Sequence, residues 1–339
     1  MQIENSSLMI SPWPHRWAVA LACVTFPLVW VGGLVTTTDS GMAVPDWPTT
    51  YGYNLFLYPW QSWIYGPWAL FLEHSHRLVG ATVGMLTIGL LVVLWRKDNR
   101  LWIRWLGAAA LILVIVQGIL GGMRVLNDDR AMAMFHGATG PLFFALTVAM
   151  VVFTSRTWIS APVAAPPPEG HTHVRRLAIV TCILVYLQIV LGAVVRHVPV
   201  VAEPTTFALA VRFHLLLAAI LSLHVVALAW SVLRYSRRVR PLPGLAWAMI
   251  GLLVVQLALG AGTWLVKFAV PSWATGWITI GSLAVQEGGW LQTHVITAHV
   301  AVGSLLLATS TALALYAQRL HLAVASMQKT PIVRLEAAL

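Results

Sequence analysis

Histidines recur along the apolar parts of this sequence, and one of them stands beside a carboxylate and an arginine. The stretch Phe71–Gly84 reads FLEHSHRLVGATVG and opens an apolar run that continues to Leu94. An ionisable side chain in the middle of a membrane costs about 3 kcal/mol on insertion scales, so such residues mark functional sites by default. Glu73, His76 and Arg77 are therefore candidate functional residues.

Four histidines are each followed, four residues later, by a small residue. The segments HRLVG, HGATG, HLLLA and HVAVG begin at His76, His136, His214 and His299. On a helix, positions i and i+4 share one face, and a small residue lets a flat ligand approach closely. Two such helices in one bundle supply two axial imidazoles to a haem. The pattern predicts two bis-histidine haem positions, one in each half of the chain.

The alternatives are a simple hydrogen bond between helices and a non-haem metal centre. Zinc or iron centres usually add carboxylates or cysteines beside the histidines, and only Glu73 is available in the repeat. Glu73 shares a face with His76 and Arg77, and we expect it to mark the first half as the place for chemistry. A purely structural Glu73–Arg77 ion pair is the other interpretation. The equivalent positions in the other repeats are Ala133, Val211 and Ile296.

The remaining polar residues near the span ends are less specific. His74 should point away from His76, because residues two apart on a helix lie about 200° apart. His224 and His294 fall outside the repeat register and are candidates for supporting contacts. Four arginines could neutralise haem propionates or lie at the interface: Arg77, Arg124, Arg196 and Arg212. Five histidines are expected in solvated loops or tails: His15, His171, His173, His197 and His321.

The elements that carry these residues are predicted to be membrane spans. The chain has 339 residues, of which 59% are hydrophobic and 9% charged, whereas about 25% of residues in soluble proteins are charged. Windows of about 20 apolar residues, the length that crosses a bilayer, predict eight spans. They lie near residues 17–37, 67–95, 102–124, 133–155, 176–196, 209–233, 244–267 and 291–316. The predicted fold class is an all-α polytopic membrane protein.

The spans form a repeat. Odd-numbered spans end alike, as VWVGGLVTT, VQGILGGMRV, LQIVLGAVVRH and VQLALGAGTWLVK, and each even-numbered span carries one of the four histidines. A repeat of this kind predicts two homologous four-helix bundles. Their bounds are residues 1–157 and 175–320, with a proline-rich linker at 158–174 and a tail at 321–339.

The charge of the chain indicates topology rather than a polyanion partner. The net charge is +10, but the basic residues gather in short alternate loops, as the positive-inside rule describes. We therefore expect cytoplasmic termini, linker and tail, a lipid bilayer around the spans, and no nucleic acid. Cys23 and Cys182 lie in apolar runs, which leaves the loops without a disulfide or thiolate metal site. The first apolar run is expected to be a retained helix rather than a signal peptide.

The chain resembles the heme A synthase family from about Trp17 to Tyr316. The resemblance rests on E-x-x-H-R at Glu73–Arg77, on one histidine in each even-numbered span, and on GGLVTTTDSGMAVPDWPTTYGYNLFLYP. It implies a plasma-membrane enzyme that oxidises the C8 methyl of haem O to the formyl of haem A for cytochrome oxidase. Many bacterial relatives carry a cysteine pair in the first outer loop, and residues 39–66 have none.

The resemblance also implies roles for the candidate residues. Glu73 and His76 match the catalytic motif, with His136 and Arg77 beside them at the substrate haem, and His214 and His299 match the ligands of a resident haem b. Haem O synthase and cytochrome oxidase assembly factors are the candidate protein partners, and a homo-oligomer stays open. Two rival functions remain: a cytochrome b-type quinol oxidoreductase, and a haem transporter or chaperone that releases haem unchanged.

Overall fold

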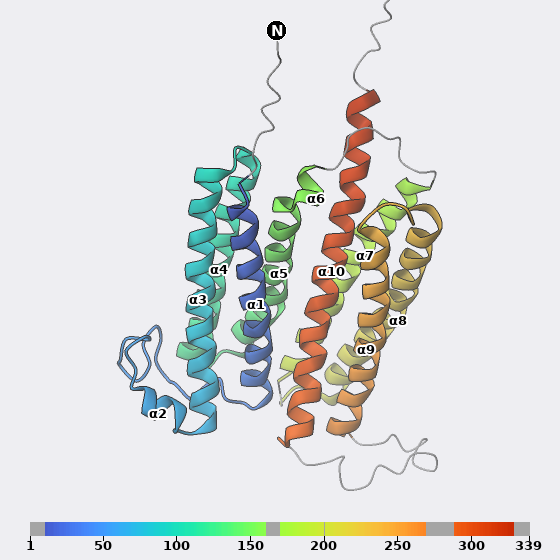
Figure 1. Ribbon diagram of the computed structural model, residues 1–339. Helices are drawn as coiled ribbons and strands as arrows, with labels where there is room; N and C mark the ends of the chain where they lie inside the picture. The colour runs from blue at the N-terminus through green and yellow to red at the C-terminus, as the bar shows by residue number, and fades with distance from the viewer. Residues whose placement is uncertain (1–10, 161–169, 200, 269–287, 329–339) are drawn as a thin grey trace, which may run out of the picture.

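The computed structural model is built of helices that run nearly side by side (Figure 1). It describes residues 11–160, 170–199, 201–268 and 288–328. Over these residues the helices are α1 (Trp13–Thr37), α2 (Trp60–Ile64), α3 (Trp68–Lys97), α4 (Leu101–Asn127), α5 (Arg130–Thr154), α6 (Arg156–Ile159), α7 (His171–His197), α8 (Pro204–Tyr235), α9 (Leu242–Phe268) and α10 (Trp290–Gln328). Apart from α2 and α6, all are long and apolar enough to cross a membrane. The predicted all-α fold with eight spans is confirmed.

Helix extends beyond or into two of the predicted ranges. The last span, Trp290–Arg319, lies close to the predicted 291–316. Its helix α10 continues to Gln328, because the following residues, largely Ala, Leu, Gln and Arg, are strong helix formers. The predicted linker at 158–174 begins inside α6 and ends inside α7, so helix occupies both of its ends. The middle of that linker, 161–169, and the end of the predicted tail, 329–339, lie outside the described residues.

The long helices pack as two groups that touch along a shared boundary. Helices α1, α3, α4 and α5 contact one another, as do α7, α8, α9 and α10, and the groups meet where α1 and α5 lie against α10 and where α5 lies against α7. Each group has its own buried apolar cluster, one around Leu21 and Leu90, the other around Leu228 and Leu313. The division of the chain into two homologous halves at these boundaries stays a prediction.

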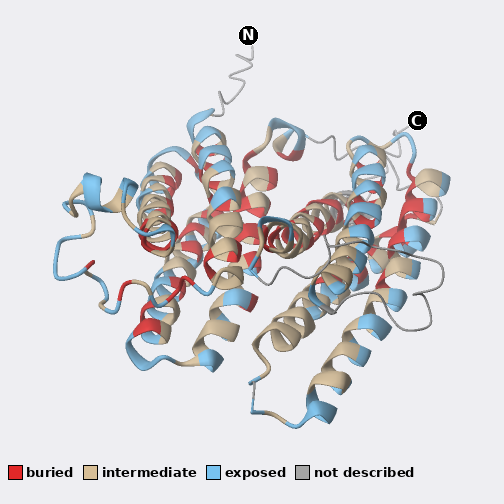
Figure 2. Ribbon diagram, turned by 90° about the horizontal axis from the view of Figure 1, so that it is seen from below, coloured by how far each residue is buried: buried red, intermediate tan, exposed pale blue. Residues whose placement is uncertain are grey.

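Large apolar side chains are also exposed around the outside of the bundle. Ile112, Leu223, Trp230 and Trp247 are each more than 60% exposed, and Figure 2 shows buried residues toward the interior with exposed residues around the perimeter. In water such a surface would aggregate, whereas in a bilayer it faces lipid tails. The exposed apolar perimeter agrees with a multi-pass membrane protein.

The connection between α1 and α3, residues 38–67, forms a folded loop at the lower end of the bundle (Figure 1). Asp46 organises its centre, because its carboxylate accepts hydrogen bonds from the Thr49 hydroxyl and from the amides of Tyr51 and Gly52. Burial alone would raise the pKa of Asp46, but the hydrogen bonds from Thr49, Gly52 and Tyr51 outweigh it and hold the pKa below its ordinary value. The loop therefore contains an ionised aspartate that fixes its shape.

Candidate functional site

The four repeat histidines meet as two pairs. His76 on α3 faces His136 on α5 with ring centres 6.2 Å apart and ring planes at 86°. His214 on α8 faces His299 on α10 with ring centres 6.4 Å apart and planes at 68°. Each pair joins two even-numbered spans of one half, as the repeat predicts, and the two pairs have nearly the same dimensions.

A glycine on the preceding span supports each ring. A Cβ atom placed on Gly32 would lie 2.9 Å from Cε1 of His76. The same construction gives 3.2 Å for Gly121 and His136, 3.3 Å for Gly192 and His214, and 3.2 Å for Gly260 and His299. These glycines lie within the similar segments of the odd-numbered spans. Because they have no side chain, the imidazoles can pack closely against the neighbouring helix.

The spacing of the rings fits a haem iron between two axial imidazoles. A metal–nitrogen bond of about 2 Å, with roughly 1.1 Å from nitrogen to ring centre, separates two coaxial ring centres by about 6.2 Å. Across the described residues, no three His, Cys, Asp or Glu side chains gather as a metal cluster. The donor set therefore fits bis-histidine ligation of a haem better than a zinc or carboxylate-iron centre, which would draw on further ligands.

In the sequence EHSHR, Glu73 and Arg77 contact the outer loop, and His76 faces its partner histidine. Glu73 is buried, with Oε1 accepting from Arg77 at 2.6 Å and Oε2 accepting from the Val44 amide at 2.9 Å. Arg77 also donates to the carbonyl oxygens of Val44, Asp46 and Thr49, at 2.9, 2.6 and 2.8 Å. The ion pair thus holds the loop against α3, one helical turn from His76.

His74 belongs to the loop rather than to the histidine pair, as its position on the helix predicts. Its ring is fully buried, Nδ1 lies 3.1 Å from the Thr50 hydroxyl, and the rings of Tyr58 and Trp63 pack against it. Trp47 of the same loop contacts a second helix, because its indole occupies the space beside Gly122 on α4. Gly122 follows the glycine that supports His136, so the loop reaches both helices of the first pair.

Two arginines lie near the first pair without a carboxylate partner. Arg196 on α7 donates from Nη2 to the Gly33 carbonyl at 3.0 Å and to the Thr37 hydroxyl at 2.6 Å, both on α1. Arg124 on α4 interacts electrostatically with Arg196, His76 and His136. In the described part of the chain, neither guanidinium forms an ion pair, so both charges are available to an anionic ligand.

The prediction for the loop histidines is wrong in three cases. His171 is fully buried at the start of α7, because the helix begins at this residue where a loop was predicted. Its ring lies 3.3 Å from the Ser236 hydroxyl and 3.0 Å from the Ala317 carbonyl. His15 is half-buried in α1 and lies 3.2 Å from the Thr154 hydroxyl. His197 is half-buried and contacts the Ala193 carbonyl. His173 is exposed, as expected, and the side chain of His321 lies outside the described residues.

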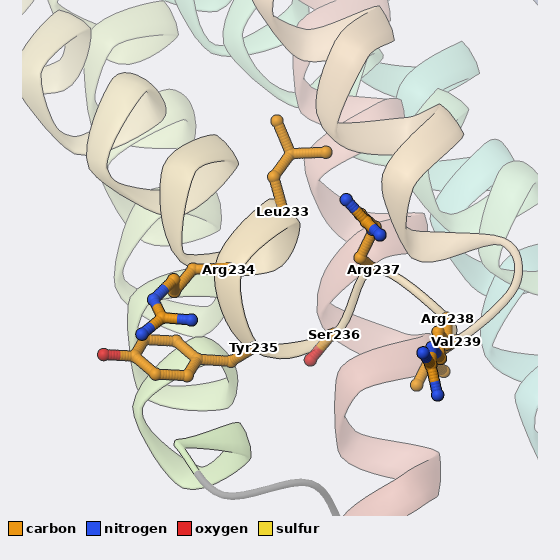
Figure 3. Close-up of a pocket in the computed structure, with 7 residues that line it drawn as sticks. All are labelled: Leu233, Arg234, Tyr235, Ser236, Arg237, Arg238 and Val239. Carbon is orange, nitrogen blue, oxygen red and sulfur yellow. The ribbon is translucent and has the colours of Figure 1, made fainter.

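One cavity among the described residues lies away from the histidine pairs. It has a volume of about 490 Å³ and is lined by the segment from Leu233 to Val239, between α8 and α9 (Figure 3). Three arginines of this segment, Arg234, Arg237 and Arg238, lie in that view with no histidine among them. Basic residues commonly gather in loops at the ends of membrane spans, so we assign this cavity no chemistry.

Fold and site define an integral membrane protein with two paired-histidine sites on matching helix pairs. A family model described as cytochrome oxidase assembly protein matches residues 67–211. The heme A synthase of Symbiobacterium thermophilum is 31% identical over 272 residues, which cover 72% of this chain and 84% of that protein. That of Exiguobacterium sibiricum is 30% identical over 270 residues, 74% and 86% of the two chains. The chain belongs to the heme A synthase family.

Proposed function

We propose that this protein oxidises the C8 methyl of haem O to the formyl of haem A in the plasma membrane, for use by cytochrome oxidase. The observation that supports it most is the two histidine pairs, with ring centres 6.2 and 6.4 Å apart. Among the described residues, only the first pair has an ion pair beside it, between Glu73, one turn before His76, and Arg77, the residue after His76. Two similar haem positions with unequal surroundings suit an enzyme that converts one haem and keeps the other.

In this proposal His76 and His136 bind the substrate haem O, and His214 and His299 hold a resident haem b. With the oxygen counted as water, the conversion CH3 + H2O → CHO + 4 H+ + 4 e− releases four electrons, and haem b would pass them one at a time to an electron acceptor outside the protein. Arg124 and Arg196 are the candidates for the propionates, since their charges have no carboxylate partner in the described residues. Arg77 donates mainly to the loop carbonyls and to Glu73, so we place it at the edge of the substrate site.

Glu73 has two tasks in this proposal. Its carboxylate fixes the outer loop through Val44 and Arg77, which keeps water from the first pair. Its negative charge, one turn from His76, stabilises positive charge that develops on the substrate or accepts a proton from it. The other three repeats have apolar residues at this position, and we accordingly place the chemistry in the first half.

The test is conversion of haem. Membranes that contain the protein are supplied with haem O, and the extracted haems are separated by chromatography, with His76→Ala as the matched inactive control. New haem A that depends on His76 supports the enzyme. Unchanged haem O would contradict the proposal. A quinone-dependent redox change of fixed haem would then favour the quinol oxidoreductase, and simple release of haem would favour the transporter.

A further inference from the structure

The loop between α1 and α3 and the first turn of α3 form an uncharged, aromatic stretch of the chain. Residues 47–72 contain no Asp, Glu, Lys or Arg, and ten of these 26 residues are Trp, Tyr or Phe. Aromatic residues make up only 10% of the chain as a whole. The concentration of aromatic side chains in one uncharged stretch calls for a physical reason.

Some of these aromatic side chains face the protein. The rings of Tyr58 and Trp63 pack against the ring of His74, with ring centres 5.0 and 5.4 Å away. Trp63 also donates from Nε1 to the Ser75 hydroxyl at 3.1 Å. These contacts attach the short helix α2 to α3, and they therefore fix which side chains of the loop are left facing outward.

Other large apolar side chains of the same stretch face outward. Leu57 and Tyr65 are 75% and 78% exposed, and Trp60, Ile64 and Trp68 are exposed as well. Trp60 and Ile64 stand one turn apart on α2, and the rings of Trp60 and Tyr65 lie 6.1 Å apart. We call these five residues the apolar surface of the loop. An exposed surface of this kind marks a site that meets a membrane or another protein.

The side chains of the apolar surface favour a membrane over a protein partner. Tryptophan and tyrosine combine an apolar ring with one polar group, and they concentrate where lipid tails meet the headgroups and water. A protein-binding surface normally has a polar rim and is enriched in arginine. The uncharged stretch at 47–72 offers neither an arginine nor any other charge.

The position of the apolar surface agrees with this preference. Trp68 begins α3, which is long and apolar enough to cross a membrane and which exposes further apolar side chains such as Met85 and Ile88. Figure 1 shows α2 and the loop to one side of the lower end of α3. The apolar surface thus adjoins the perimeter that faces lipid, at one end of a span.

We propose that the partner of the apolar surface is the lipid–water interface of the membrane, so that the loop is anchored in the bilayer instead of lying in water. The loop then joins two environments. Its inner side binds Glu73 and His74 on α3 and packs Trp47 against Gly122 on α4, whereas its outer side contacts lipid. This inference goes beyond the proposed function, because it concerns the surroundings of the loop and holds whatever reaction the protein performs.

Spin labels on the loop test the proposal in the haem-loaded protein in lipid nanodiscs. The native cysteines are first removed as Cys23→Ala and Cys182→Ser, and a nitroxide is attached to Leu57→Cys or Tyr65→Cys. Oxygen concentrates in lipid and a nickel chelate stays in water, so the ratio of the two collision rates reports where a label lies. Haem absorbance equal to that of the unlabelled protein checks that each variant is folded.

Two further labelled positions provide the references. Leu223→Cys replaces an exposed leucine of α8 and reports lipid, and Asn127→Cys lies at the exposed end of α4, next to Asp128 and Asp129, and reports water. The oxygen-to-nickel ratio at both loop positions should lie well above that of Asn127→Cys and approach that of Leu223→Cys. A ratio equal to that of Asn127→Cys would overturn the proposal and leave the surface open to a protein partner.

Hydroxyl-radical labelling of the unmodified protein decides the matter if the cysteine variants lose haem. In nanodiscs, Trp60 and Tyr65 should be oxidised as slowly as Trp230, an exposed aromatic residue near the end of α8. Rapid oxidation of Trp60 and Tyr65 while Trp230 is protected would place the loop in water and overturn the proposal.

Discussion

Replacing Gly32 with alanine should disturb His76 more than the equivalent change disturbs any other paired histidine. The added Cβ would lie 2.9 Å from His76 Cε1, whereas Gly121, Gly192 and Gly260 give 3.2–3.3 Å to their own histidines. Ordinary contact begins near 3.4 Å, so His76 must move by about 0.5 Å, the limit within which functional groups must be held. The other three rings need to move by only about 0.1–0.2 Å, which a side chain accommodates by small rotations.

The expected magnitude follows from that shift. A displacement of 1 Å can cost about 100-fold in rate, so a displacement of about 0.5 Å should reduce haem A formation by Gly32→Ala roughly tenfold, equivalent to about 1.4 kcal/mol in the barrier. The assay is haem A formed from added haem O per amount of protein, together with the absorbance of bound haem. Gly192→Ala should keep most of its resident haem.

Two glycines provide matched controls, one on the helix that carries His76 and one on the helix that carries Gly121. A Cβ atom added to Gly84 on α3 or to Gly118 on α4 would have no other atom within 4 Å among the described residues, and alanine in a helix is favoured over glycine by about 0.5–1 kcal/mol. Gly84→Ala and Gly118→Ala should therefore fold and convert haem O at the wild-type rate. Wild-type turnover by Gly32→Ala, or an equal loss in the two controls, would refute the packing argument.

Three further predictions concern the loop, the carboxylate and the topology. Glu73→Gln keeps an acceptor for the Val44 amide but removes the charge, so haem absorbance should persist while haem A formation falls greatly; near-normal turnover would remove its chemical role. Because the folded pKa of Asp46 is lowered, its stabilisation of the loop is present above its ordinary pKa of 3.8 and is lost as pH falls through the folded value. The protection factors of the Tyr51 and Gly52 amides, which compare the observed hydrogen exchange with that of an open peptide at the same pH, should be high at about pH 6 and fall in acid; protection that does not change with pH would contradict this. A reporter inserted near Pro167 should be cytoplasmic and one near Asp128 extracytoplasmic, and the reverse at both would overturn the orientation.

The spans and the histidine pairs could be predicted from the sequence because each depends on local patterns. The length of an apolar run predicts a membrane span. A histidine at the same position in four spans predicts that the histidines meet in pairs. The position of His74 away from His76 also follows from helix geometry alone. In each case the pattern is found within single helices and does not depend on which side chains of distant segments touch.

Contacts between segments far apart in the chain could not be predicted. Val44 and Thr50 of the loop meet Glu73 and His74, and Arg196 meets Thr37 on another helix, because side-chain direction and loop path decide such contacts. The proline-rich stretch before His171 predicts a solvated loop there, whereas the helix begins at that residue and buries it.

Three glutamines near the histidine pairs, Gln117, Gln188 and Gln256, did have a sequence signal. Each stands four residues before its glycine in VQGILGG, LQIVLG and VQLALG, and the first span has leucine in that place. The spacing alone does not show which side of the helix meets the histidine. The structure supplies that direction, because it places Gln188 beside His214 and Gln256 beside His299.

The assignment of the two haem sites is tested most directly by the haem content of four purified variants: His76→Ala, His136→Ala, His214→Ala and His299→Ala. Absorbance spectra are recorded and the extracted haems are separated after supply of haem O. We predict that the first two retain haem b but neither bind nor convert haem O. The last two should lose haem b or change its spin state, because each removes an axial ligand. Loss of the resident haem in His76→Ala, with its retention in His214→Ala, would contradict the assignment of the two halves.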